Sequence, residues 1–213
     1  ESFDPINGGF GTQPKFPGSM SLSFCLGEYR RTGRNQLLEI VNTSLQKMAD
    51  GGIYDHLGGG FHRYSVDAEW LIPHFEKMLY DNALLIRPYM EAYRLTDDLQ
   101  YRRVVEETAE YVIREMLQPG GGFYATQDAD SEGEEGKFFA WTPGQIVEIL
   151  GTDDGGLFCR YYGVEEIGNF EHGTSVLHVP VEADTLAAHL KIDGAHLGAV
   201  LTKGRGQLFD VRE

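Results

Sequence analysis

Positive charge is scarce in this sequence. Among its 213 residues, 18 are Lys or Arg and 33 are Asp or Glu, which gives a formal net charge of −15. A nucleic-acid binder needs a basic surface to neutralise phosphates, and a protein that docks on an anionic membrane needs one too. The charge balance therefore argues against nucleic acid and against an anionic membrane as partners.

Long hydrophobic runs and cysteines are also lacking. No stretch of about 18 consecutive apolar residues occurs, so the sequence predicts no membrane-spanning helix. Its two cysteines, Cys25 and Cys159, are too few for a disulfide framework or a cysteine-only metal site, and they favour a reducing, cytoplasmic location. The sequence has no C-x-x-C pair, and its glycine clusters match no phosphate- or dinucleotide-binding motif, so we expect no cofactor.

What the sequence does contain is helical periodicity separated by glycine-rich, aromatic loops. Apolar spacing, capping residues and stop signals predict helices over 19–32, 35–50 with Asn35 as its cap, 73–95 with a kink or break at Pro88, 98–117, and from Thr142 onward. Short strands are expected over 137–141 and 175–179, without regular strand–helix alternation. The pattern predicts a mainly α fold built of antiparallel helical hairpins.

Residues 56–82 combine aromatic and titratable side chains at a density typical of a ligand pocket. The candidate acid–base groups in this stretch are His74, Asp81, Glu76, Asp67 and His62. The candidate substrate contacts are Arg63, Tyr64 and Trp70. In the predicted helix from Pro73, His74 and Asp81 share a face, and Lys77 is spaced for a salt bridge to Asp81. The alternative is a packed loop whose charges pair with one another, with His74 bonded to a backbone carbonyl.

An acidic run follows at residues 128–135, flanked by aromatic residues. Its first six residues resemble a calcium-binding EF-hand loop, but Phe139 replaces the Glu required at the twelfth position, so we predict no metal site. Carboxylates beside aromatic rings suit sugar binding, which makes Asp128, Asp130 and Trp141 further candidate substrate contacts. The alternative is an ordinary solvated acidic segment.

Three segments carry a family resemblance: GGFGTQPKFP at residues 8–17, GGIYDHLGGGFHRYSVDAEWLIPHFEKMLYDNALL at 51–85, and GGFYATQDADSEGEEGKFFAWT at 121–142. They resemble the thioredoxin-domain-containing proteins of the spermatogenesis-associated-protein-20 type. The resemblance implies part of an (α/α)6 toroid, similar to six-hairpin glycosidases and N-acylglucosamine 2-epimerases. It also implies that residues 1–213 are a single, incomplete toroid domain, with the rest of the toroid and an upstream thioredoxin-like domain as partners.

Two functions are compatible with these observations. The first is an enzyme that acts on a sugar or sugar-derived molecule, as an epimerase, isomerase or glycoside hydrolase, using paired acid and base groups. The second is a noncatalytic helical scaffold or protein-interaction module attached to a thioredoxin-like domain. In the second case the motif residues serve folding, and their charges tie loops to helix ends.

Overall fold

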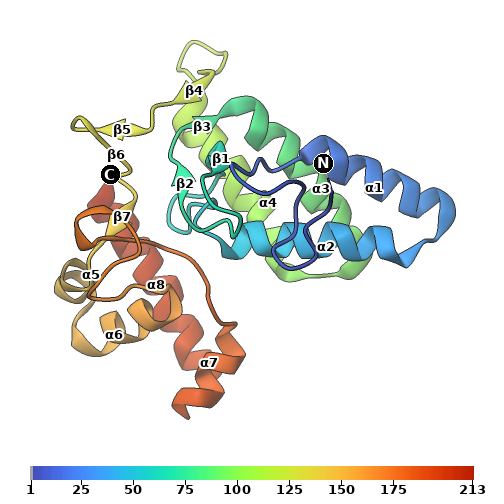
Figure 1. Cartoon of the computed structure of the whole chain (residues 1–213). Coiled ribbons are helices and arrows are strands. Elements are labelled where there is room, and N and C mark those ends of the chain that lie inside the picture. Colours follow the sequence, from blue (N-terminus) through green and yellow to red (C-terminus); the bar gives the residue numbers. More distant parts are fainter. Residues whose placement is uncertain (1) are drawn as a thin grey trace. The chain divides into compact units, whose positions relative to one another are not determined.

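Helices make up most of the structure, and short strand pairs lie in the loops between them (Figure 1). The computed structural model describes residues 2–213. These fall into two compact units, unit 1 through Gly136 and unit 2 over Lys137–Glu213. That the whole chain belongs to one toroid domain stays a prediction.

Unit 1 is built on two helical hairpins. Helices α1 (Ser19–Thr32) and α2 (Asn35–Asp50) form the first, and α3 (Leu79–Thr96) and α4 (Leu99–Tyr111) form the second. A π-helical turn, Val112–Met116, continues α4. Helix α1 packs against α2 and α3, and α3 packs against α4, so the four helices share one core. The helix residues of that core include Leu22, Leu26, Leu45, Met48, Leu85, Tyr89 and Tyr101.

Helix boundaries in unit 1 lie at or near the capping and terminating residues of the sequence. The range of α1 is the predicted one, and Gly33 ends the helix in the left-handed conformation, with φ +68°. The range of α2 is also confirmed, but Asn35 is its first helical residue; Arg34 occupies the cap position without a side-chain bond. Asp98 caps α4 by accepting a hydrogen bond from the Gln100 amide at 2.9 Å.

The predicted helix from Pro73 is wrong in its first turn and a half. Pro73–His74 form strand β2, Lys77–Met78 form strand β3, and α3 begins only at Leu79. Strand β2 pairs antiparallel with β1 (Tyr64–Ser65), and β3 pairs with β4 (Thr126–Gln127). Backbone pairing with these loops therefore outweighs the helical pattern. Pro88 does not break α3, which runs on to Thr96 with Pro88 buried.

A small hairpin ends unit 1, formed by β5 (Asp130–Ser131) and β6 (Glu134–Glu135). Glu132 and Gly133 make its two-residue turn, with φ values of +54° and +81°. Positive φ at both positions is the type I′ geometry that suits tight hairpins. The acidic run is thus a β-hairpin, in which the Glu132–Gly133 pair makes the turn.

Unit 2 contains four helices and one strand pair. Helices α5 (Pro143–Leu150), α6 (Thr152–Tyr161) and α7 (Ala183–Leu190) pack with α8 (Gly194–Arg212), and a 3₁₀ turn spans Glu171–Gly173. Strand β7 (Ala140–Trp141) pairs antiparallel with β8 (Ser175–Val176), within the ranges expected to hold strands. The predicted capping box at Thr142 and Gln145 is confirmed. Across residues 2–213, no helix is both long and apolar enough to cross a lipid bilayer.

Candidate functional site

Five of the residues singled out in the sequence converge around the β1–β2 hairpin and the start of α3. Tyr64 and His74 are direct partners in the antiparallel pairing of β1 with β2. The Arg63 amide donates to the Glu76 carbonyl at 2.8 Å. This bond extends the backbone contact between the two segments beyond the Tyr64–His74 pair, toward β3. We refer to Arg63, Tyr64, His74, Glu76 and Asp81 as the hairpin cluster.

His74 is held on three sides. Its ring stacks on Tyr64, with ring centroids 5.0 Å apart and an interplanar angle of 24°. Its Nδ1 lies 2.7 Å from Glu135 Oε1, and its Nε2 lies 3.6 Å from Glu76 Oε2. The side chain keeps 27% of its surface exposed, so a ligand can still reach the imidazole.

The Glu76 carboxylate accepts hydrogen bonds from two segments, the residue before β1 and strand β4. The Arg63 guanidinium donates to Oε2 at 2.8 Å, and the Thr126 hydroxyl of β4 donates to Oε1 at 3.1 Å. The Glu76 carboxylate raises the pKa of Arg63 by hydrogen bonding to its charged form. Arg63 Nε is buried and finds no acceptor among the described residues, so one donor of the guanidinium is unused.

Asp81 lies in the first turn of α3 and is the most perturbed carboxyl of the cluster. Burial raises its pKa to about 6, with a smaller contribution in the same direction from Glu76, while Arg63 opposes the shift. Its Oδ2 is buried and finds no hydrogen-bond partner among the described residues. A carboxyl that exchanges its proton near neutral pH is suited to general acid–base chemistry.

An aromatic surface borders these polar groups. The Phe16 ring contacts Tyr64, with centroids 5.0 Å apart, and Tyr64 in turn stacks on His74. Phe16 is half exposed. Aromatic rings beside carboxylates and a guanidinium can bind a polyhydroxylated molecule, with its apolar face on a ring and its hydroxyls on the charged groups.

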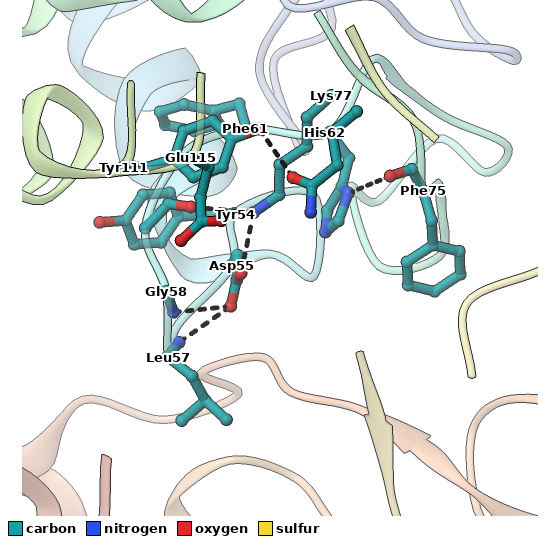
Figure 2. Close-up of polar contacts among 12 residues, drawn as sticks. Tyr54, Asp55, Leu57, Gly58, Phe61, His62, Phe75, Lys77, Tyr111 and Glu115 are labelled. Carbon is teal, nitrogen blue, oxygen red and sulfur yellow. Dashed lines mark hydrogen bonds and ion pairs between the residues drawn. The ribbon is translucent and has the colours of Figure 1, made fainter. Parts of the chain in front are cut away.

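Lys77 is not part of the cluster, and its predicted salt bridge to Asp81 is wrong. Its ammonium is buried and lies 2.8 Å from Asp55 Oδ2 and 2.9 Å from the Gly59 carbonyl (Figure 2). It also lies 4.3 Å from the centroid of the Tyr111 ring. Alternation along β3 points Lys77 inward, because neighbouring side chains of a strand face opposite sides.

Three predicted site residues form hydrogen bonds within the fold. His62 is buried, and its Nδ1 lies 2.9 Å from the Phe75 carbonyl, a contact that is drawn as a dashed line in Figure 2. Asp67 organises its own loop by accepting bonds from the Ser65 hydroxyl and from the amides of residues 69, 71 and 72. Trp70 is fully buried, and its Nε1–H donates to the Asn7 carbonyl at 2.8 Å. Because these polar groups are bonded within the fold, the three residues are not part of the hairpin cluster.

The remaining candidates are two aspartates of unit 1 and a tryptophan of unit 2. Asp128 and Asp130 are exposed at the start of the β5–β6 hairpin, where Asp128 accepts a bond from the Asp130 amide. Trp141 is buried within unit 2, and its Nε1 finds no acceptor among the described residues. Among the described residues of unit 1, neither aspartate is hydrogen-bonded to the hairpin cluster.

The structure adds residues that sequence reasoning missed, chiefly Glu135, Thr126 and Phe16. Each contacts the cluster from a loop distant in sequence; Glu135, for example, lies 61 positions from His74. The only sequence signal for these residues was the acidic and aromatic composition of the loops that carry them. In residues 2–213, no group of three or more His, Cys, Asp or Glu side chains is arranged to hold a metal ion.

The fold has a counterpart among solved structures. A sugar epimerase from a ruminal bacterium superimposes with a TM-score of 0.53 and 20% identity, covering 70% of this chain and 42% of the epimerase. The chain is therefore mainly helical with a fold of the helical-toroid class, like that of the sugar epimerase, which confirms the predicted fold class.

Sequence comparison then identifies the family. Spermatogenesis-associated protein 20 of mouse is 35% identical over 241 aligned residues that include the whole chain, and the human protein has the same identity. A Caenorhabditis elegans protein is 38% identical over 187 residues, or 79% of this chain. The chain belongs to the family of spermatogenesis-associated protein 20 and spans about 30% of the length of the mouse and human relatives. No family model matches the sequence.

Proposed function

We propose that this region binds a sugar or sugar-derived molecule at the hairpin cluster and serves its epimerisation or isomerisation. The observation that carries the proposal is the cluster itself, in which a partly exposed His74, a guanidinium and a carboxyl that titrates near neutral pH adjoin an aromatic surface. The helical-toroid fold supports it, although a fold by itself does not fix a function.

In the proposed reaction, His74 removes the proton from the carbon beside the sugar carbonyl. The electron pair of that C–H bond forms a carbon–carbon double bond while the π pair of the carbonyl moves onto its oxygen, where donors of Arg63 stabilise the resulting enolate. Asp81, in its protonated form, returns a proton to carbon. Glycoside hydrolysis is the competing chemistry, since it too needs a protonated carboxyl and a second, ionised one.

We also propose that the rest of a toroid and a thioredoxin-like domain adjoin this region in the complete protein. Their contribution would be to close the sugar site and to present a redox partner. The alternative is a noncatalytic helical scaffold. The hydrogen bonds that His62, Asp67 and Trp70 make within the fold favour this alternative, because they leave fewer residues for a sugar site.

A ligand screen on the full-length protein tests the proposal. Saturation-transfer NMR with aldoses, ketoses and N-acetylated hexosamines should reveal binding, and loss of the C2 proton signal in D₂O should report proton exchange. His74→Ala and Asp81→Asn should abolish the exchange, while His189→Ala, an exposed histidine on α7, should not. A folded protein that binds no sugar in this screen would leave the scaffold as the better account.

A further inference from the structure

We infer that Glu135 is the positioning residue of His74: it holds the proton of the imidazole on Nδ1 and so makes Nε2 the atom that exchanges protons with a ligand. This inference deepens the proposed function and rests on it for the use to which Nε2 is put. It concerns a residue of the β5–β6 hairpin that the sequence pattern did not connect with the site.

The first argument is the chemistry of the contact. Glu135 Oε1 lies 2.7 Å from His74 Nδ1, within hydrogen-bond distance. An ionised carboxylate only accepts hydrogen bonds, so Nδ1 must carry the hydrogen. Whichever charge the imidazole has, the second proton then comes and goes at Nε2 alone.

The second argument is that Glu135 has little freedom to move. The same Oε1 accepts a bond from the Phe75 amide at 3.3 Å, so two donors from β2 and its next residue fix one oxygen. Gly136 follows with φ +74°, and a Cβ there would come within 2.4 Å of the Phe75 ring. The end of the hairpin is therefore packed directly against the segment that carries His74.

The third argument is the direction of Nε2. Tyr64 stacks on the imidazole and restricts rotation of the ring, and Glu135 fixes its Nδ1 edge. The opposite edge, with Nε2, then faces Glu76 Oε2 at 3.6 Å, on the side of Arg63. Nε2 thus lies beside the groups that would bind and stabilise a reacting carbonyl, as the base–orienter arrangement of other acid–base sites requires.

Selective ¹⁵N-histidine labelling of the protein reports the tautomer directly, with His74→Gln used to assign the signal. In the native protein we expect Nδ1 to stay protonated throughout the titration, while the Nε2 shift changes. Glu135→Ala should remove this preference. Glu135→Gln, whose amide oxygen can still accept from Nδ1, should largely retain it. Glu134→Ala is the matched control, because Glu134 precedes Glu135 in β6 and points to the other face.

A second readout separates positioning from folding. Once a sugar that shows C2 proton exchange is known, Glu135→Ala should lower kcat by at least about tenfold with little change in KM, and Glu135→Gln should recover most of it. A native His74 protonated on Nε2, or a tautomer unaffected by Glu135→Ala, would overturn the role of Glu135. A native protein with the expected tautomer but no sugar-dependent exchange would instead overturn the proposed function, and with it the use of Nε2 as a base.

Discussion

The partly buried Asp81 side chain destabilises the folded protein when its carboxyl group is ionised. Its Oδ2 is buried without a partner among the described residues, and burial raises its pKa to about 6 from an ordinary value of 3.8. The folded state therefore holds this proton more tightly than the unfolded state does. Between pH 4 and 6 the folded state binds more protons, so stability falls as the pH rises through that window.

Replacing Asp81 by Asn should for this reason stabilise the protein at neutral pH. The amide cannot ionise, so the cost of a buried negative charge disappears, and we expect the free energy of unfolding at pH 7.5 to rise by about 1 kcal/mol after allowance for solvent screening. Below pH 4 the two proteins should unfold at nearly the same urea concentration. A neutral or destabilising effect at pH 7.5 would mean that Asp81 has an ionic partner.

Residue types were easier to predict than residue roles. Arg63, His74, Glu76 and Asp81 could be picked from the sequence because titratable groups among aromatics are unusual in a plain loop. His62 and Trp70 satisfied the same criterion, yet they are buried and bonded to backbone carbonyls. The pattern of a loop does not reveal which backbone carbonyl lies opposite a side chain, because that depends on contacts made elsewhere in the fold.

At the scale of elements, the buried Lys77–Asp55 pair connects the loop after α2 with strand β3. Asp55 also accepts bonds from the amides of Leu57 and Gly58 at 3.0 Å, so one carboxylate orders the loop and neutralises the lysine (Figure 2). Glu76 immediately precedes Lys77, and α3 with Asp81 follows two residues later. The pair thus anchors the backbone on which the hairpin cluster is built.

Lys77→Met should destabilise the protein strongly, by about 3 kcal/mol, because it leaves the Asp55 carboxylate buried without its ammonium partner. The double variant Lys77→Met with Asp55→Asn should recover part of that loss, since no uncompensated charge remains. Equilibrium urea unfolding of the two single variants and the double variant gives the coupling energy. Additive effects would show that the pair contributes no interaction of its own.

Gly60 tests how closely the same loop packs against α4. A Cβ at Gly60, where φ is +81°, would come within 2.5 Å of the Tyr111 ring. Gly121 has nearly the same φ, +83°, but open space around its Cβ position. Gly60→Ala should therefore lower the free energy of unfolding by about 1–3 kcal/mol more than Gly121→Ala does. Because the two glycines have nearly the same φ, the backbone strain is similar in both variants, and the difference between them measures overpacking. Equal losses in thermal or urea unfolding would contradict the packing argument.

Element boundaries were predictable where local chemistry decides them. Gly33, Asp98 and the Thr142 capping box fixed helix ends, because a left-handed glycine or a side-chain cap acts within a few residues. The start of α3 was not predictable by this means. Pro73 suits a first helical turn, but it also suits a short strand, and here pairing with Tyr64–Ser65 decides between them.

At the scale of the whole molecule, the chain has a net charge of −15, and the hairpin cluster has the same excess of acidic over basic groups. Three carboxyl groups, Glu76, Asp81 and Glu135, accompany one guanidinium, and that guanidinium is already bonded to Glu76. Near neutral pH the cluster therefore presents an excess of negative charge. The charge balance of the sequence argues against nucleic acid as a partner, and the same electrostatic reasoning applies to the charge of a small ligand.

If the cluster binds sugars, it should prefer uncharged sugars to their phosphorylated forms. Repulsion of a phosphate dianion by two uncompensated carboxylates amounts to about 1–2 kcal/mol at solvent-accessible distances, so a hexose 6-phosphate should bind roughly tenfold more weakly than the parent hexose. Titration calorimetry at low salt measures this ratio, which should shrink as added NaCl screens the charges. Glu135→Gln should reduce the ratio of hexose affinity to hexose 6-phosphate affinity, because it removes one negative charge from the cluster. Glu39→Gln changes the net charge by the same amount on α2 and should leave this ratio unchanged. Tighter binding of the phosphate would locate the site elsewhere, because a cluster with this charge cannot favour a second anion without a cation to receive it.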